Sequence, residues 1–164
     1  MAGIRLEGDV RGLMKKIANL KNIDLRGVNL TLGETLRTST VQRFKDEEDP
    51  DEKAWEPSIR AKEENGKTLT STALLRRSIK TSVSGSGFAV GTNKIYAATH
   101  QFGDEGRTIR AKSSKGLRFK IGSRWITKKK VVVNIPARPF LGISEKDMTE
   151  IKRTLEELVA GDEE

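Results

Sequence analysis

The chain has 164 residues, of which 35% are hydrophobic and 33% are charged, and its formal net charge is +8. A chain of this size can bury one hydrophobic core, so we expect a single domain over residues 1–164. It has no cysteine and one histidine, which excludes disulfides, thiolate catalysis and cysteine zinc sites, and we expect neither a cofactor nor a metal. No run approaches the roughly 18 apolar residues of a membrane span, and no secretory signal is evident. We therefore predict synthesis in the cytoplasm and no membrane contact.

Charge is unevenly distributed along the chain. Residues 104–130, which we call the arm, hold ten Lys and Arg against two acidic residues, a balance of +8. These candidate partner-binding cations are Arg107, Arg110, Lys112, Lys115, Arg118, Lys120, Arg124, Lys128, Lys129 and Lys130. Residues 144–164 hold eight Asp and Glu against three Lys and Arg, a balance of −5. The pattern predicts docking onto charged partners, and two solvated surfaces are the simpler alternative.

Helical periodicity dominates the first part of the chain. It predicts an amphipathic helix over residues 9–20, and Gly27 is expected to break the segment that follows. A second helix is predicted over residues 30–47. Its apolar stripe consists of Leu32, Leu36, Thr40 and Phe44.

An acidic run, residues 46–53, ends that helix, because Pro50 cannot continue the helical hydrogen bonds. The run could attract a cation, but it lacks the ligand order of a calcium loop, so we interpret it as a solvated linker. Residues 54–71 are expected to be irregular. Residues 72–77 are expected to form a helical turn that presents Leu74 and Leu75 inward.

A β-hairpin and a short helix are predicted next. Residues 79–84 and 88–92 alternate apolar with polar side chains around a Gly-Ser-Gly turn. Residues 94–102 have Ile95, Ala98 and Phe102 on one helical face, and Gly103 is placed to end that helix.

The last third of the chain predicts the arm, a strand and a helix. Apolar residues alternate with polar ones from Leu117 to Ile121, which predicts a long hairpin with a mobile tip. Residues 131–135 are predicted to form a strand, and residues 136–143 a turn made rigid by its prolines. The final helix, residues 144–160, begins with a capping box of Ser144 and Asp147. Its apolar stripe is Met148, Ile151, Leu155 and Leu158.

These elements together predict an α+β fold. We expect a mainly antiparallel sheet with helices on one face, and the arm as a long basic β-hairpin or loop.

Catalytic motifs are sparse. His100 is the only imidazole, and the Gly-Ser-Gly turn at residue 86 is too short for a nucleophile elbow. We therefore interpret His100 as a residue that packs or hydrogen bonds at a structural corner, and we expect no enzyme. For the arm we favour docking onto an acidic protein surface. Contact with passing DNA and plain solvation remain the alternatives.

Four sequence blocks resemble the phage virion morphogenesis family. They are Phe44 with Asp49–Asp51 and Trp55–Ser58, then Leu74–Ile79, then Val90–Gly103, and finally Ile135–Gly142, and they occur in the order typical of the family. Glu52 and Ala73 depart from it, since the family often has glycine at both positions. The motif residues that carry the resemblance most directly are Trp55, Tyr96, His100, Gln101, Phe102, Gly103, Pro136, Arg138, Pro139 and Phe140.

The resemblance implies a structural, non-enzymatic protein in the virion of a tailed bacteriophage. Such proteins act in tail completion, as a tail terminator or in head–tail joining at the neck, commonly as a hexameric ring. The implied partners are further copies of the chain and proteins of the tail tube or the neck connector. The alternative is a basic protein that binds nucleic acid without sequence specificity during DNA packaging or transfer.

Two further expectations rest on this resemblance. The arm would reach a neighbouring subunit, and the acidic C-terminal helix could be its counterpart there. Phe140 would pack against the helix that ends at Phe102, and Arg138 would pair with a carboxylate or a backbone carbonyl. A purely intramolecular corner is the alternative for both residues.

Overall fold

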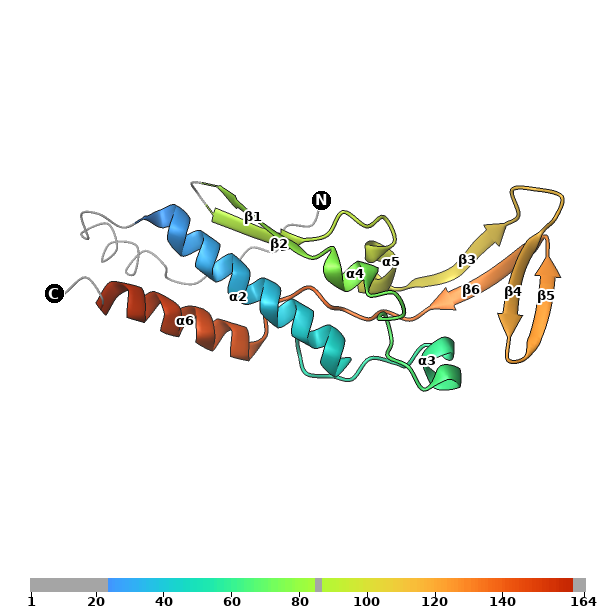
Figure 1. The fold of residues 1–164 in the computed structure, drawn as a ribbon, viewed down its shortest axis with the longest axis horizontal. Helices are drawn as coiled ribbons and strands as arrows, with labels where there is room; N and C mark the ends of the chain where they lie inside the picture. Colours follow the sequence, from blue (N-terminus) through green and yellow to red (C-terminus); the bar gives the residue numbers. More distant parts are fainter. Residues whose placement is uncertain (1–23, 85–86, 161–164) are drawn as a thin grey trace.

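The computed structural model describes residues 24–84 and 87–160, and the predicted helix over residues 9–20 lies outside them. The elements, labelled as in Figure 1, are α2 (Leu25–Asp46), α3 (Ile59–Glu64), α4 (Leu74–Arg77), β1 (Lys80–Ser84), β2 (Gly87–Gly91), α5 (Ala97–Phe102), β3 (Asp104–Arg110), β4 (Leu117–Ile121), β5 (Arg124–Lys128), β6 (Lys130–Ile135) and α6 (Glu145–Ala160). Three antiparallel pairs form, β1 with β2, β3 with β6 and β4 with β5. The α+β prediction is confirmed, and the strands form two-stranded ribbons.

The helix α2 begins earlier than its sequence pattern indicated. Asp24 caps it by accepting a hydrogen bond from the backbone N–H of Arg26 at 3.1 Å, and the helix then continues through Gly27. The predicted break at Gly27 is therefore wrong, because the cap one turn earlier starts the helix before the glycine is reached. The predicted stripe is confirmed: Leu32, Leu36, Thr40 and Phe44 are all buried.

The helix α2 lies between the β1–β2 ribbon and α6 (Figure 1). The ribbon approaches closely at Gly33, where a Cβ atom would overlap the methyl carbon of Thr81. On the other side, α6 begins with the predicted capping box. The Ser144 hydroxyl accepts from the Asp147 N–H at 3.0 Å, and the Asp147 carboxylate accepts from the Ser144 N–H at 2.8 Å.

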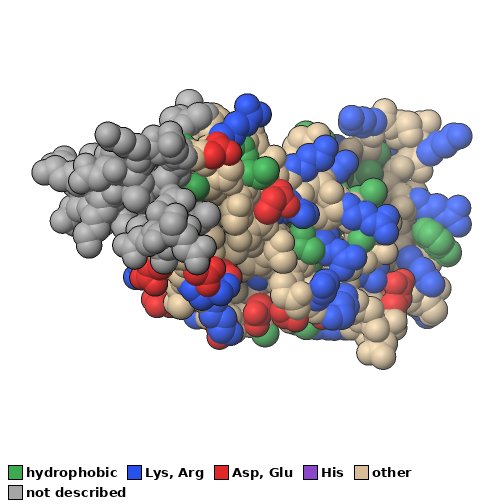
Figure 2. Space-filling view, turned by 60° about the vertical axis from the view of Figure 1, so that its left-hand side comes forward, with side chains coloured by type: hydrophobic (Ala, Val, Ile, Leu, Met, Phe, Trp, Pro, Cys, Tyr) green, Lys and Arg blue, Asp and Glu red, His purple; other side chains and the backbone are tan. Residues whose placement is uncertain are grey.

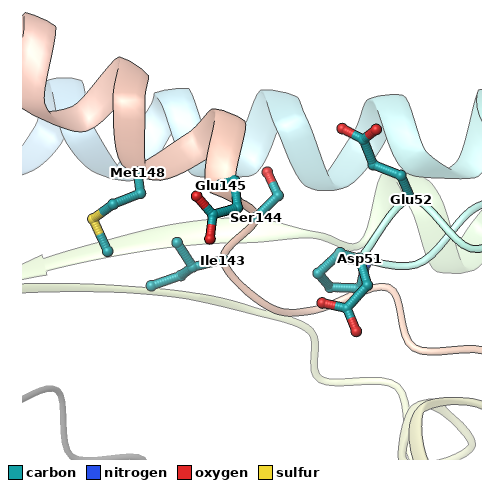
Figure 3. Close-up of a pocket in the computed structure, with 7 residues that line it drawn as sticks. Asp51, Glu52, Ile143, Ser144, Glu145 and Met148 are labelled. Atoms are coloured by element: carbon teal, nitrogen blue, oxygen red, sulfur yellow. The ribbon is translucent and has the colours of Figure 1, made fainter.

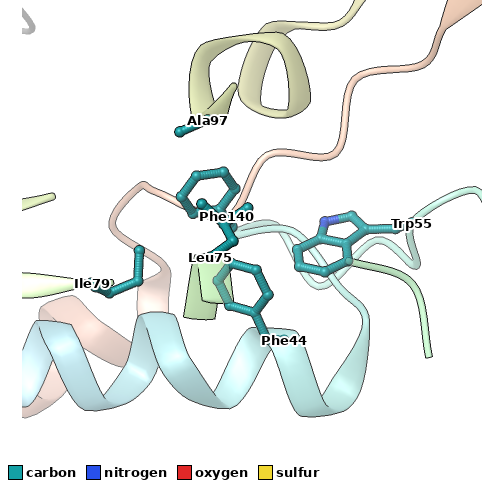
Figure 4. Close-up of a cluster of buried hydrophobic side chains, with 6 residues drawn as sticks. All are labelled: Phe44, Trp55, Leu75, Ile79, Ala97 and Phe140. Carbon is teal, nitrogen blue, oxygen red and sulfur yellow. The ribbon is translucent and has the colours of Figure 1, made fainter. Parts of the chain in front are cut away.

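The hydrophobic core lies where α2, α4, α5 and three connecting segments meet. Its buried members are Phe44, Trp55, Leu75, Ile79, Ala97 and Phe140 (Figure 4). The Phe44 ring lies 5.5 Å from the Trp55 ring and 5.2 Å from the Phe140 ring, between centroids. Leu75 is buried as predicted, but Leu74 is 53% exposed. One turn of helix can direct only one of two adjacent side chains inward.

Two short helices differ from the sequence-based expectation. Within the segment expected to be irregular, α3 forms and is capped by the Ser58 hydroxyl, which accepts from the Ala61 N–H at 3.2 Å. Four of its six residues are charged, so no apolar stripe marks it. In α5 the predicted buried face is wrong, since Ile95 and Phe102 are 96% and 79% exposed. Ala97 is buried instead, because that side of the helix faces the core.

Candidate partner interface

The arm and the strand that follows it, β6, form two ribbons in succession. The β3–β6 ribbon leads away from the helices, and the β4–β5 ribbon lies at its far end (Figure 1). The first ribbon closes where the Ala111 N–H donates to the Lys129 carbonyl at 2.9 Å. The second pairs Leu117 with Lys128 and Ile121 with Arg124. The predicted hairpin is therefore present, with a second ribbon at its end.

All ten predicted cations of the arm are exposed. Arg107 is held at the base of the arm, where it donates to the Asp104 carboxylate at 2.9 Å and to the Thr99 hydroxyl at 3.0 Å. Within residues 24–84 and 87–160, the other nine form no ion pair. Figure 2 shows Lys and Arg side chains gathered toward the end of the molecule away from the grey residues. Unpaired charge of one sign over this region produces a field that attracts an acidic partner.

The far end of the arm also presents apolar side chains. Trp125 is 62% exposed and Ile121 is 56% exposed. The Arg118 guanidinium lies over the Trp125 ring, 4.6 Å from its centroid, in a cation–π contact. The N–H of Gly122, in the turn between β4 and β5, donates to the Glu63 carboxylate of α3 at 3.2 Å. Exposed aromatic and cationic groups together are typical of a protein-binding surface.

The base of the arm is fixed by a hydrogen-bonded cluster that we call the anchor, comprising Trp55, Glu56, residues 100–103 and residues 136–141. Gln101 lies at its centre. Its side-chain amide donates to the Leu141 carbonyl at 2.9 Å, and its carbonyl oxygen accepts from the N–H groups of Phe140 and Leu141 at 3.1 and 3.0 Å. One side chain therefore joins the segment before the arm to the segment after it.

Three further contacts complete the anchor. The Arg138 N–H donates to the His100 carbonyl at 2.7 Å, and its guanidinium donates to the Glu56 carbonyl at 2.7 Å. The Trp55 indole N–H donates to the Pro139 carbonyl at 2.9 Å. Of the two partners expected for Arg138, a carboxylate or a backbone carbonyl, the structure shows a backbone carbonyl, that of Glu56 in the same chain. Arg138 and Trp55 are each 5% exposed, so these bonds are protected from competing water.

Gly103 connects α5 to the arm and is required by its geometry. Its φ angle is +76°, and a Cβ atom there would lie 2.9 Å from the backbone nitrogen of Ala137. Gly103 thus ends α5, as predicted. Because it has no side chain, the backbone can pass close to the proline-rich segment at Ala137. Phe140 is fully buried in the same core cluster as Ala97 of α5, as its predicted packing required.

The other motif residues have more exposed positions. Tyr96 is 40% exposed, and its ring lies edge-on to the His100 ring at 6.0 Å. Pro136 and Pro139 are half-buried. Burial, followed by the charge of Arg138, lowers the pKa of His100 below its usual value, which favours the neutral imidazole at pH 7. Its position at the corner of the anchor agrees with the structural interpretation of this residue.

Sequence reasoning missed a buried ion pair between Arg43 of α2 and Asp147 of α6, each 4% exposed. Arg43 also donates to the Phe140 and Gly142 carbonyls at 3.1 and 2.9 Å. Burial alone would raise the pKa of Asp147. Hydrogen bonds from Ser144 and Ser39 and the charge of Arg43 outweigh it and lower that pKa. Arg43 follows Thr40 by three residues, so its position beside the buried stripe was the available signal.

The sequence matches the phage virion morphogenesis family over residues 7–160. The match covers most of the chain, and the protein belongs to this family. Its role is therefore structural, in the assembly of a phage virion. No curated protein and no solved structure matches the chain. Among the described helices, none is both long and apolar enough to cross a membrane.

Proposed function

We propose that the protein completes or terminates the tail of the virion, or joins the tail to the head, as a ring of identical subunits, most simply a hexamer. Membership of the virion morphogenesis family supports an assembly role. We further propose that it has no enzymatic activity and that its partners are copies of itself and proteins of the tail tube or neck.

The arm is the observation that carries this proposal. It is fixed at its base by the anchor, while nine of its cations have no ion-pair partner among the described residues. A cyclic assembly with head-to-tail contacts needs two different surfaces on each subunit. A projecting basic arm and an acidic region elsewhere on the body meet that requirement.

The test removes the far ribbon without disturbing the anchor. Because Ala111 and Lys129 are hydrogen-bonded neighbours, residues 112–128 can be replaced by an Asn-Gly turn that closes the β3–β6 hairpin. We expect the shortened protein to unfold at nearly the same temperature as the parent chain but to remain monomeric by mass photometry, also with purified tail tubes. A shortened chain that forms rings as the parent does would refute the role of the arm.

A second candidate function, non-specific binding of nucleic acid, is favoured by the stacking of Arg118 on Trp125 amid unpaired cations. It predicts DNA binding whose logarithmic affinity falls linearly with the logarithm of salt concentration. A gel shift at low and moderate salt measures this. Binding that is absent even at low salt removes this candidate.

A further inference from the structure

An open groove lies between the acidic loop after α2 and the beginning of α6. It is lined by Pro50, Asp51, Glu52, Ile143, Ser144, Glu145 and Met148 and encloses about 560 Å³. Figure 3 shows these side chains contributed by two segments that approach each other from opposite sides. The groove is therefore formed by residues almost a hundred positions apart in the sequence.

The groove combines an apolar base with an acidic rim. Ile143 is 46% exposed, and Met148 and Pro50 are half-buried beside it. Asp51, Glu52 and Glu145 are exposed around them. Two lysines lie nearby: Lys53 contacts Asp51 at 3.3 Å, and Lys146 contacts Glu52 at 2.6 Å. Such exposed pairs are weak and can exchange for other cations.

Further acidic residues extend the rim. An adjoining hollow is lined by Asp46, Glu48 and Asp49, together with Pro50 and Glu52 of the groove. The hydrogen bond to Glu52, followed by the charges of Glu52, Glu48 and Asp46, raises the pKa of Lys146, which agrees with the acidic lining of the two hollows. A ligand for the groove would therefore carry several positive charges around an apolar group.

The far end of the arm has that combination. Trp125 and Ile121 are exposed apolar side chains, and Arg118, Lys120 and Arg124 belong to the same ribbon. The arm cannot occupy the groove of its own subunit, since its tip contacts Glu63 of α3 and the groove lies at the start of α6 (Figure 1). A tip that fills the groove therefore belongs to another copy.

We propose that the groove binds the β4–β5 tip of a neighbouring copy, with Trp125 over the apolar base and the tip cations against the acidic rim. This inference rests on the proposed function and specifies its contact. The sequence-based expectation assigned the binding site for the arm to the acidic C-terminal helix as a whole. The present proposal assigns it to the groove at the first turn of that helix. Because tip and groove are different surfaces, each subunit uses one of each, and the contact closes into a ring or continues as a fibre.

The test exchanges charge between the two surfaces. One variant carries Asp51→Lys and Glu52→Lys in the groove, and the other carries Arg118→Glu and Arg124→Glu at the tip. We expect each variant alone to assemble at least tenfold more weakly than the parent chain by sedimentation velocity. Mixed in equal amounts they should assemble again, because each altered surface then meets its complement on the other variant. The matched control is Glu156→Lys with Glu157→Lys on the exposed face of α6, which should assemble normally.

A second measurement follows the tip directly. The chain has two tryptophans, and Trp55→Phe leaves Trp125 as the only one. On assembly, its fluorescence emission should shift to shorter wavelength as the indole leaves water. A parent chain that never assembles, even with tail tubes, contradicts the proposed function. A Trp55→Phe chain that assembles while Trp125 stays exposed, or a groove variant that assembles as well as the parent chain, contradicts only the groove contact.

Discussion

The anchor and the arm adjoin each other in sequence, and they use their side chains in opposite ways. In the anchor, Trp55 and Arg138 are each 5% exposed and donate hydrogen bonds to carbonyls of distant segments. In the arm, the same residue types at Trp125 and Arg118 stack on each other at the surface. The difference shows that residue type alone does not separate structural from partner-binding positions. What separates them is whether the polar atoms are already satisfied within the chain.

Truncating a buried and an exposed phenylalanine of the anchor should give the largest difference in stability. Phe140→Ala removes a fully buried ring from the core and should destabilise the protein by about 3–5 kcal/mol. Phe102→Ala, at 79% exposure, should change stability by less than about 0.5 kcal/mol. Urea unfolding followed by circular dichroism measures both. Equal losses would mean that Phe102 is part of a core.

The buried ion pair should give the next largest effect. Asp147→Ala leaves the Arg43 guanidinium buried without its carboxylate, at a loss of about 3 kcal/mol in unfolding free energy. The control is Glu150→Ala, which breaks an exposed pair with Arg153 and should have little effect. A similar loss of unfolding free energy in the two variants would show that the buried pair of Arg43 and Asp147 stabilises the fold no more than an exposed pair does.

The same pair predicts a pH dependence. The pKa of Asp147 is lower in the folded protein than its ordinary value of about 4, so its contribution to stability is complete above that pH. As pH falls through the lowered pKa, protonation removes the contribution. The parent chain should therefore lose more unfolding free energy than Asp147→Asn between neutral pH and about pH 2. Identical profiles would show that Asp147 titrates normally.

The smallest difference in stability should come from two glycines, Gly103 in the anchor and Gly106 in the arm. Gly106 has a φ of +66°, and a Cβ atom there would meet nothing within 4 Å, so Gly106→Ala should destabilise by about 1 kcal/mol through backbone strain alone. Gly103→Ala adds a clash with the backbone of Ala137 and should reach about 2–3 kcal/mol. Thermal unfolding measures both. A Gly103→Ala variant as stable as Gly106→Ala would contradict the close crossing at the anchor.

The sequence predicted those features that follow from a local rule, either a long periodic pattern or a motif within one helical turn. The stripe from Leu32 to Phe44 covers more than three helical turns, and the capping box of Ser144 and Asp147 acts within one turn. Sequence reasoning failed in α5, where six residues cannot define a face and the core determines which side is buried. The anchor could be predicted as a motif, but not as a network, because Gln101 bonds to atoms 39 and 40 positions away. Arg43 escaped notice because a helical arginine usually reaches solvent.

The bonds of Gln101 have an evolutionary consequence. They tie residue 101 to residues 140 and 141, so the segment between them is a loop whose two ends are already fastened. Lengthening a loop with fixed ends is cheap, since each doubling adds only about 0.6 kcal/mol of closure entropy. Insertions, deletions and wholesale exchange of this segment can therefore accumulate while the body stays intact. Related phages could in this way fit one scaffold to tails of different design.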